Sequence, residues 1–241
     1  MKSYKARGIV LHTVRYGENS MVVFMLTDML GRQSYIVQGV RGGKSRGNKT
    51  ALFQPMFLLG FEGYESPRMQ MHRMREPRVE VPLMSVPFDV RKSTISLFMA
   101  EVLYRFVKET EPDSPLFDFV WNSVGALDSM REGIANFHLW FMVMLSSHLG
   151  FYPGNEYVAG SWFDIQNGIF TPVMPSHRLM LGREDTALLA DIMETQPEEL
   201  GGIKLSRERR SSFLEAMLLY FGYHLDSMNN IRSVQILREV F

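Results

Sequence analysis

The chain is organised around Gly31-Arg-Gln-Ser-Tyr-Ile-Val-Gln-Gly-Val-Arg-Gly-Gly-Lys-Ser-Arg-Gly-Asn-Lys-Thr50. This stretch begins as a predicted strand and continues as a glycine-rich loop. No Asp or Glu occurs from residue 29 to residue 61, so no neighbour in the sequence neutralises its cations. These cations are Arg32, Arg41, Lys44, Arg46 and Lys49. Cations on an accessible loop beside a β surface suit a phosphate-rich polymer.

The charge is divided unevenly along the chain. The 241 residues are 46% hydrophobic and carry a net charge of zero, which is typical of a globular protein. Residues 1–80 nevertheless hold 13 Lys and Arg against 6 Asp and Glu, a net of +7, and residues 81–241 hold 13 against 20, a net of −7. We therefore predict a polyanion-binding domain over residues 1–80 and a second domain, with another task, over residues 81–241.

The chain contains no cysteine, which excludes disulfides, thiolate zinc sites and cysteine nucleophiles. This composition suits a reducing cytoplasm. The N-terminal residues lack the apolar core of a signal peptide. The most apolar run, residues 139–145, is much shorter than the ~20 residues of a membrane span. We expect a cytoplasmic protein.

Residues 4–77 are predicted to form strands. Apolar and β-branched segments separated by turn residues indicate strands over residues 8–15, 20–26, 32–40, 52–61 and 68–75. Five short strands in about 75 residues fit a small barrel. Pro55 falls inside the fourth strand and predicts an edge or a bulge there. Pro77 and Pro82 mark the expected domain boundary.

Beyond residue 82 the apolar pattern becomes helical, so the fold class is predicted to be α+β. The expected helices are an amphipathic one with its apolar stripe from Ile95 to Phe106, a second over 116–130, a central buried one over 134–149, and two more over 185–194 and 206–225, with a short helical tail over 232–241. A hairpin insertion is expected within about residues 151–175, with Asn167 and Gly168 forming a type I′ turn.

The basic loop has two other readings. Gly39-Val-Arg-Gly-Gly-Lys-Ser45 resembles a nucleotide P-loop, but it has three rather than four residues before the Gly-Lys-Ser, and a strand rather than a helix follows. A run of cations is also often only a solvated hairpin tip. The missing acids and the charge split favour a binding role over both.

Aromatic residues near these cations suggest a surface for single-stranded nucleic acid. Arg15 and Tyr16 lie at the first predicted turn, on the rim of the barrel. Bases stack on aromatic rings while cations follow the phosphates. Tyr35 is equally well interpreted as a stacking platform or as a cross-strand packing residue. The candidate DNA-binding residues are Arg15, Tyr16, Arg32, Tyr35, Arg41, Lys44, Arg46 and Lys49.

The sequence predicts no catalytic site, no cofactor and no metal. None of the six histidines has a partner at the i, i+4 spacing of a helical zinc site, and no nucleophile elbow or paired carboxylate is evident. Ser206-Arg-Glu-Arg-Arg210 is a basic segment in acidic surroundings. It is interpreted first as an N-cap serine opening a solvated helical turn, and alternatively as a contact for an acidic partner.

A series of segments resembles the RecO family of bacterial recombination mediators. They are Ala6-Arg-Gly-Ile-Val-Leu-His-Thr-Val-Arg-Tyr-Gly-Glu18, Thr27-Asp-Met-Leu-Gly31, Gly39-Val-Arg41 with Lys44-Ser45, Gln54-Pro55, Leu149-Gly-Phe-Tyr-Pro153, Phe163-Asp-Ile-Gln-Asn-Gly-Ile-Phe-Thr171 and Ile231-Arg-Ser-Val-Gln-Ile-Leu237. Their order is that of the family, and they span nearly the whole chain.

This resemblance implies a five-stranded OB-fold followed by a mainly helical domain. It implies a non-enzymatic protein for DNA repair, recombination and the response to DNA damage, associated with the nucleoid. Such a protein binds single- and double-stranded DNA, anneals complementary strands and helps to load the RecA recombinase onto strands coated by single-strand-binding protein. The implied partners are DNA, RecR and the acidic C-terminal tail of single-strand-binding protein, with RecA an indirect one.

The chain departs from the family around the hairpin. Many members carry four cysteines there as a zinc site, and this chain has none. We therefore expect the hairpin to be held by packing of Trp162, Phe163 and Phe170. For the acidic-tail pocket, an apolar groove with a cationic rim is expected, with Arg105, Lys108 and the Arg207–Arg210 cluster as candidates.

Two functions from other classes remain open on sequence grounds. In the first, the chain is a protein–protein adaptor whose basic barrel binds an acidic protein. In the second, it is a hydrolase, which needs a pocket with convergent, pKa-shifted groups.

Overall fold

The computed structural model describes residues 3–39, 49–64, 71–108, 110–225 and 230–241. The chain forms two compact units, residues 1–128 and residues 129–241. The first unit holds all five strands of the barrel and two helices that follow them. The division into domains at residue 80 stays a prediction.

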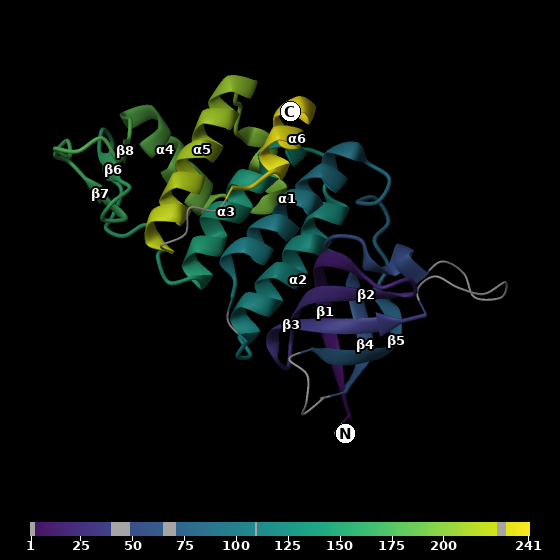
Figure 1. The fold of residues 1–241 in the computed structure, drawn as a ribbon. Coiled ribbons are helices and arrows are strands. Elements are labelled where there is room, and N and C mark those ends of the chain that lie inside the picture. The colour runs from purple at the N-terminus through teal and green to yellow at the C-terminus, as the bar shows by residue number, and fades with distance from the viewer. Residues whose placement is uncertain (1–2, 40–48, 65–70, 109, 226–229) are drawn as a thin grey trace. The chain divides into compact units, whose positions relative to one another are not determined.

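Five strands of the first unit close into a barrel in the order β1-β2-β3-β5-β4 (Figure 1). All neighbours are antiparallel except β3 and β5, which are parallel. This closed five-stranded barrel, followed by helices, confirms the predicted α+β class and the OB-fold. The strands are β1 (Ser3–Tyr16), β2 (Ser20–Thr27), β3 (Gly31–Gln38), β4 (Leu58–Tyr64) and β5 (His72–Val81).

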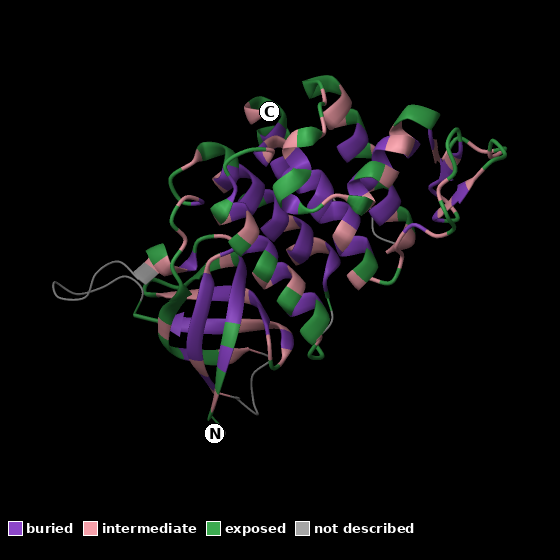
Figure 2. Cartoon of the chain, turned by 180° about the vertical axis from the view of Figure 1, so that it is seen from behind, coloured by how far each residue is buried: buried purple, intermediate pink, exposed green. Residues whose placement is uncertain are grey.

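The barrel interior is filled by alternate residues of each strand, because successive side chains of a strand point to opposite faces. Val23, Tyr35 and Leu59 are fully buried in it, and the buried strand residues are visible in Figure 2. Packing is close enough that a Cβ added to Gly8 would lie 2.7 Å from the Met25 methyl carbon. The apolar alternation seen in the sequence is therefore the alternation between core and surface.

The fourth and fifth strands differ from their predicted bounds. A 3-10 helix, η1 (Lys49–Phe53), and a turn occupy the first half of the predicted fourth strand, so Pro55 precedes β4 and lies outside the sheet. Proline cannot donate to a ladder, and the chain satisfies this by turning before the strand begins. β5 in turn continues past Pro77, which sits at a bulge in the strand.

Two helices of the first unit pack on the outside of the barrel: α1 (Val90–Phe106) and α2 (Ser114–Ser129). Tyr104 of α1 covers His12 and Phe24, with ring centroids 4.6 and 5.2 Å away. Arg7 of β1 pairs with Asp28 at 3.0 Å, and its guanidinium lies over two aromatic rings of α2. The helices therefore cover one part of the barrel surface and leave another part to solvent.

The second unit is built around α3 (Phe137–His148), which is buried nearly all round, as predicted. Its other helices are α4 (Arg183–Glu194), α5 (Arg207–His224) and α6 (Ser233–Val240), with short 3-10 turns η2 (Ile134–Asn136) and η3 (Pro197–Gly202). Both α4 and α5 pack on α3. The predicted helices of this unit are confirmed to within a few residues.

The hairpin insertion forms as predicted but gains a third strand. β6 (Trp162–Asp164) pairs with β7 (Ile169–Thr171) on one side and with β8 (Met180–Leu181) on the other. The type I′ prediction is wrong, because only Gly168 has a positive φ and the connection runs over four residues. The turn is stabilised instead by the Asp164 carboxylate, which accepts hydrogen bonds from the backbone and side chain of Asn167.

Aromatic packing holds the hairpin against α5. Phe163 and Phe170 are buried, with ring centroids 5.3 Å apart, and the Phe163 ring lies 5.3 Å from that of Tyr220. Trp162 contributes less to the core, since it is half-buried under the Arg183 guanidinium. Within the described ranges, no three His, Asp or Glu side chains gather as a set of metal ligands.

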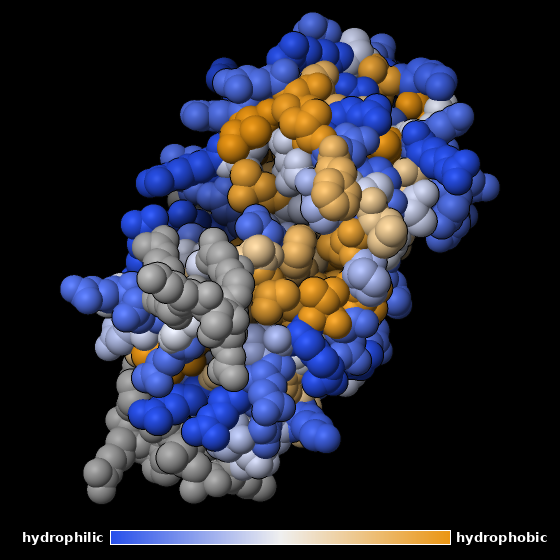
Figure 3. All heavy atoms as spheres, turned by 90° about the vertical axis from the view of Figure 1, so that its right-hand side faces the viewer, coloured by the Kyte–Doolittle hydropathy of each residue, from blue (hydrophilic) through white to orange (hydrophobic). Residues whose placement is uncertain are grey.

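The surface carries exposed apolar side chains between β5 and α1. Met84 and Phe88 are 76% and 84% exposed. Figure 3 shows apolar side chains exposed on one face within largely hydrophilic surroundings. No helix in the described part of the chain is long and apolar enough to cross a membrane.

Candidate nucleic-acid interface

Three neighbouring strand ends of the barrel lie in register at the edge where the basic loop leaves. Tyr16 at the end of β1 pairs with Ser20 of β2, and Ser20 pairs with Gln38 of β3. With a strand spacing of ~4.8 Å, Tyr16 and Gln38 are about 10 Å apart. Tyr16 is 48% exposed and Arg15 is exposed beside it. Both residues thus lie at this end of the barrel, and their part in DNA binding stays a prediction.

The neighbouring strand, β5, adds two cations to the same surface. Arg73 pairs with Ile36 of β3 on one side and with Tyr64 of β4 on the other. Met74 between them points into the barrel core, so Arg73 and Arg75 both point outward and are exposed. The Arg75 guanidinium lies 4.9 Å from the centroid of the Tyr64 ring. We call Tyr16, Gln38, Tyr64, Arg73 and Arg75 the barrel face. Arg15 pairs with Met21 on the core side of β1, so it lies at the barrel rim beside this face.

A cleft opens within the barrel face because the β3–β5 ladder is short. Only Tyr35–His72 and Ile36–Arg73 pair, although both strands continue. The space between the diverging strands has a volume of about 280 Å³. It is lined by Ile36, Val37, Gln38, Arg73, Met74, Arg75, Glu76 and Pro77. The edges of two strands and three charged side chains thus face one hollow.

Arg32 is not part of this surface. Its guanidinium donates a hydrogen bond of 2.7 Å to the Val107 carbonyl at the end of α1, and lies 4.6 Å from the Tyr104 ring centroid. Burial lowers the pKa of Arg32, and the Tyr104 contact opposes that shift. The residue fastens α1 to the barrel, and its contacts there leave little of the guanidinium for a phosphate.

Tyr35 follows the packing alternative. Its ring is fully buried in the barrel core, 4.9 Å from the ring centroid of Phe61. Its hydroxyl lies 3.2 Å from that of Tyr4, which lies 2.7 Å from Nδ1 of His72. Burial and this hydrogen bond raise the pKa of Tyr35. The ring has no exposed face on which a base could stack.

The remaining predicted residues belong to the basic loop. Arg41, Lys44 and Arg46 lie outside the described residues, as does the side chain of Lys49. Their role stays a prediction. The described chain nevertheless shows where the loop starts, because Gln38 and Gly39 directly precede residue 40 at the barrel face.

Sequence reasoning missed Arg73, Arg75 and Tyr64. The signal was present in the alternation Arg73-Met-Arg75, in which two cations two residues apart in a strand must share a face. What the sequence lacked was the identity of the facing strand, since the β3–β5 pairing joins segments that are more than 30 residues apart.

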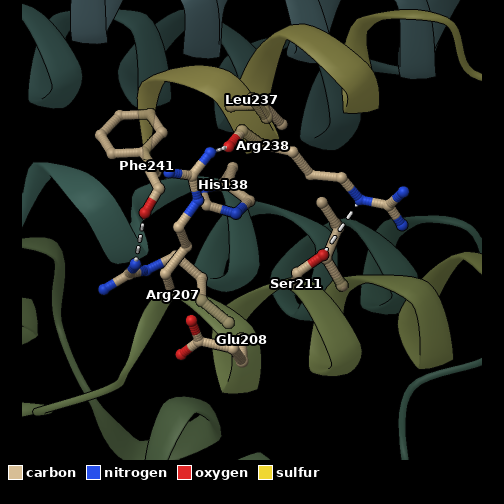
Figure 4. Close-up of a pocket in the computed structure, with 9 residues that line it drawn as sticks. His138, Arg207, Glu208, Ser211, Leu237, Arg238 and Phe241 are labelled. Carbon is tan, nitrogen blue, oxygen red and sulfur yellow. Dashed lines mark hydrogen bonds between the residues drawn. The ribbon is translucent and has the colours of Figure 1, made fainter.

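The second unit contains a pocket lined by arginines, between α3, α5 and α6 (Figure 4). Its volume is about 250 Å³. Its residues are His138, Arg207, Glu208, Arg210, Ser211, Leu214, Leu237, Arg238 and Phe241. Three arginines and Glu208 line it together with apolar side chains, and Arg238 also pairs with Glu215 outside the lining, so arginines outnumber carboxylates at the rim. We call it the arginine pocket.

Protein contacts orient the arginines of this pocket. Arg210 donates to Asn136 Oδ1 at 3.1 Å and to the Leu205 carbonyl at 3.2 Å. Arg207 donates to the Arg238 carbonyl, and Arg238 donates to Ser211 Oγ at 3.0 Å. The N-cap interpretation of Ser206 is confirmed, because its Oγ accepts from the Arg209 amide. The turn is not simply solvated, however, because Arg207 and Arg210 donate hydrogen bonds to other residues of the protein.

The floor of the arginine pocket is uncharged. His138 is fully buried beneath the Phe241 ring, with ring centroids 6.0 Å apart. Burial, aided by the Arg210 charge, lowers the pKa of His138 to about 3. The imidazole is therefore neutral at pH 7, and the positive charge of the site comes from its rim. Arg105 and Lys108, the other candidates for an acidic-tail site, lie on and just after α1 and do not line this pocket.

Comparison with known proteins places both units in one family. The family model described as "Recombination protein O N terminal" matches residues 1–79, and the model described as "Recombination protein O C terminal" matches residues 87–232. The DNA repair protein RecO of Bacteroides fragilis is 36% identical over 239 residues, which cover 98% of each chain. The RecO proteins of Phocaeicola vulgatus and Flavobacterium psychrophilum are 35% and 30% identical over 238 residues, again 98% of each chain.

Proposed function

Because the chain belongs to the RecO family of DNA repair proteins, we propose that it is a non-enzymatic recombination mediator whose barrel face binds single- and double-stranded DNA. The observation that carries this proposal is the register that brings Tyr16, Gln38 and Arg73 onto one surface at the root of the basic loop. OB-folds bind oligonucleotides at the strand 2–3 face and the adjoining loops, and Gln38 is the last residue of β3.

The chemistry of the barrel face fits a polyanion without a fixed sequence. Arg15, Arg73 and Arg75 are exposed, and none of them has an ion pair with another described residue. Exposed guanidinium groups contact phosphates and release condensed counterions from DNA. Tyr16 offers a ring on which bases of any identity can stack, and Tyr64 offers the ring face that Arg75 does not cover. The predicted cations of the loop, Lys44 and Arg46 among them, extend this surface.

The proposal predicts a loss of DNA affinity when the barrel face loses its cations. The double variant Arg73→Ala, Arg75→Ala is expected to bind labelled single strands and duplexes about tenfold more weakly, on every sequence tested, since two phosphate contacts are lost. Fluorescence anisotropy at fixed salt measures this. Arg91→Ala, which removes an exposed arginine paired with Asp89 on α1, is the matched control and should bind normally. Equal affinities for all three proteins would refute the assignment, and failure of the wild type to bind DNA would favour the adaptor function.

We place the docking of the acidic tail of single-strand-binding protein in the arginine pocket. Arg207, Arg210 and Arg238 surround an apolar floor formed by Leu214, Leu237 and Phe241. An acidic peptide with an apolar end matches both parts, because carboxylates pair with arginine forks and apolar side chains fill the floor. DNA annealing, partnership with RecR and assistance to RecA are proposed from family membership, as is action in the cytoplasm at the nucleoid.

A peptide-binding measurement tests this placement. The change Arg207→Glu is expected to lower affinity for a peptide of the single-strand-binding protein tail at least tenfold, because it reverses a charge on the pocket rim. DNA affinity should stay unchanged. Arg183→Glu, on α4 over the Trp162 ring, reverses the same charge outside the pocket and serves as the control. Equal effects of the two changes would show that the tail responds to overall charge and not to this pocket.

A further inference from the structure

The cleft between β3 and β5 is held open by an unusual stretch of backbone. Glu76 and Pro77 of β5 stand opposite the single residue Phe61 of β4, since Glu62 pairs with Arg75 and Gly60 with Arg78. This is a β-bulge. Glu76 has a φ of +48°, in the left-handed region that non-glycine residues rarely adopt. β-Bulges and non-glycine residues with a positive φ are common next to functional sites, where they redirect a side chain.

The bulge has a direct effect on the neighbouring strand. β5 bends away from β3 just after the Ile36–Arg73 pair, so the strand edges at Val37–Gln38 and Met74–Arg75 do not pair with one another. Unpaired strand edges present N–H and C=O groups to any planar ligand that enters. Pro77 has no N–H, which prevents the ladder from closing there. The cleft is therefore built into the strand geometry rather than left by a missing side chain.

Two polar side chains in the cleft have no partner among the residues that the structure describes. Gln38 and Glu76 both line it, and neither makes a side-chain hydrogen bond to another described residue. The amide of Gln38 donates and accepts, and the carboxylate of Glu76 accepts. A carboxylate is a poor neighbour for a phosphate but a good acceptor for a base N–H. Arg73 and Arg75, on the same strand, can hold the phosphates on either side.

Resting on the proposed DNA binding, we infer that this cleft takes one unpaired base of a single strand. The cleft, at about 280 Å³, lies just below the roughly 300–1,000 Å³ of pockets for drug-sized ligands, which leaves room for one base but not for a base pair. Ile36 and Val37 supply apolar walls, and Gln38 and Glu76 face the base edge. Each of the four bases offers at least one N–H and one acceptor, so the site holds a base without selecting a sequence.

The inference separates base contacts from phosphate contacts, and an abasic strand removes only the former. We compare a mixed-sequence single strand with an abasic strand of the same length and charge, by anisotropy on the full chain. The wild type is expected to bind the base-bearing strand about tenfold more tightly. The double variant Gln38→Ala, Glu76→Gly is expected to lose a large part of this preference, and stacking on Tyr16 and Tyr64 accounts for the remainder. Glycine is chosen at position 76 because it adopts the positive φ without strain and so keeps the bulge.

The two strands also distinguish failure of the cleft from failure of DNA binding. In the double variant, affinity for the abasic strand should be unchanged or slightly higher, because a negative charge is removed beside the phosphates. Glu80→Ala, which removes an exposed carboxylate of β5 outside the cleft, should keep the full base preference. Equal wild-type affinity for both strands, or an undiminished base preference in the double variant, would overturn the cleft while leaving DNA binding intact. No wild-type binding to either strand would overturn the proposed function itself.

Discussion

Arg32 and Arg73 illustrate how one residue type serves two purposes in this barrel. Arg32 donates to the Val107 carbonyl and packs on Tyr104, so its charge anchors a helix. Arg73 is exposed on the neighbouring part of the barrel and has no ion pair with a described residue. The sequence marks Arg32 as a candidate because it precedes the basic loop. Only the strand pairing reveals that Arg73 is better placed.

His138 gives a prediction at the level of a single titrating group. Its folded pKa is about 3, and that of an unfolded histidine is about 6.5. As the pH falls below 6.5 the unfolded chain takes up a proton that the folded one does not. His138 therefore contributes stability above pH 6.5 that is lost at about 1.4 kcal/mol per pH unit down to about pH 3.

Urea denaturation between pH 7 and pH 4 measures this contribution. In His138→Phe, which keeps a ring in the buried site, the free energy of unfolding should lose that component of its pH dependence. His148→Phe, in the last turn of the same helix, provides the control and should retain it. An unchanged slope in His138→Phe would mean that the buried imidazole is not the group responsible.

At the scale of elements, the strands were predictable where local pattern decides them. The first three strands and the helices of the second unit follow from apolar period and turn residues. Two features did not follow. η1 and a turn replace the first half of the predicted fourth strand, where Pro55 cannot donate to a ladder. The short β8 forms only because β6 pairs with it. The β3–β5 cleft belongs to the same class, since its cause is a bulge against β4.

The hairpin insertion yields a second prediction, about packing in place of a metal. Phe163→Ala should cost about 3–5 kcal/mol of unfolding free energy, because it empties a fully buried site beside Phe170 and Tyr220. Trp162→Ala, one residue earlier and half-buried, should cost clearly less. A metal chelator should leave the wild-type midpoint unchanged.

Urea unfolding of the second unit, followed by tryptophan fluorescence or circular dichroism, measures these differences. Equal costs for the two variants would contradict the account of aromatic packing. A drop in the midpoint with chelator would mean that a bound metal contributes to the hairpin after all.

At the scale of the whole molecule, a net charge of zero conceals two opposite halves. The basic share includes Arg73 and Arg75 as well as the loop cations, so the charge count points to the same end of the chain as the proposed barrel face. It could not show that Arg7 and Arg32 pack against the helices of the first unit. Nor could it show that cations in the acidic half gather in a pocket of their own.

The salt dependence of single-strand binding tests the central claim most directly, because each phosphate contact adds about 0.7 to the slope of log affinity against log salt concentration. We predict that Arg73→Ala, Arg75→Ala lowers the magnitude of this slope by about 1.4, and that Lys44→Ala, Arg46→Ala lowers it by a similar amount. Arg91→Ala should leave it unchanged. A wild-type slope retained in both double variants would contradict a barrel face that grips the phosphate backbone.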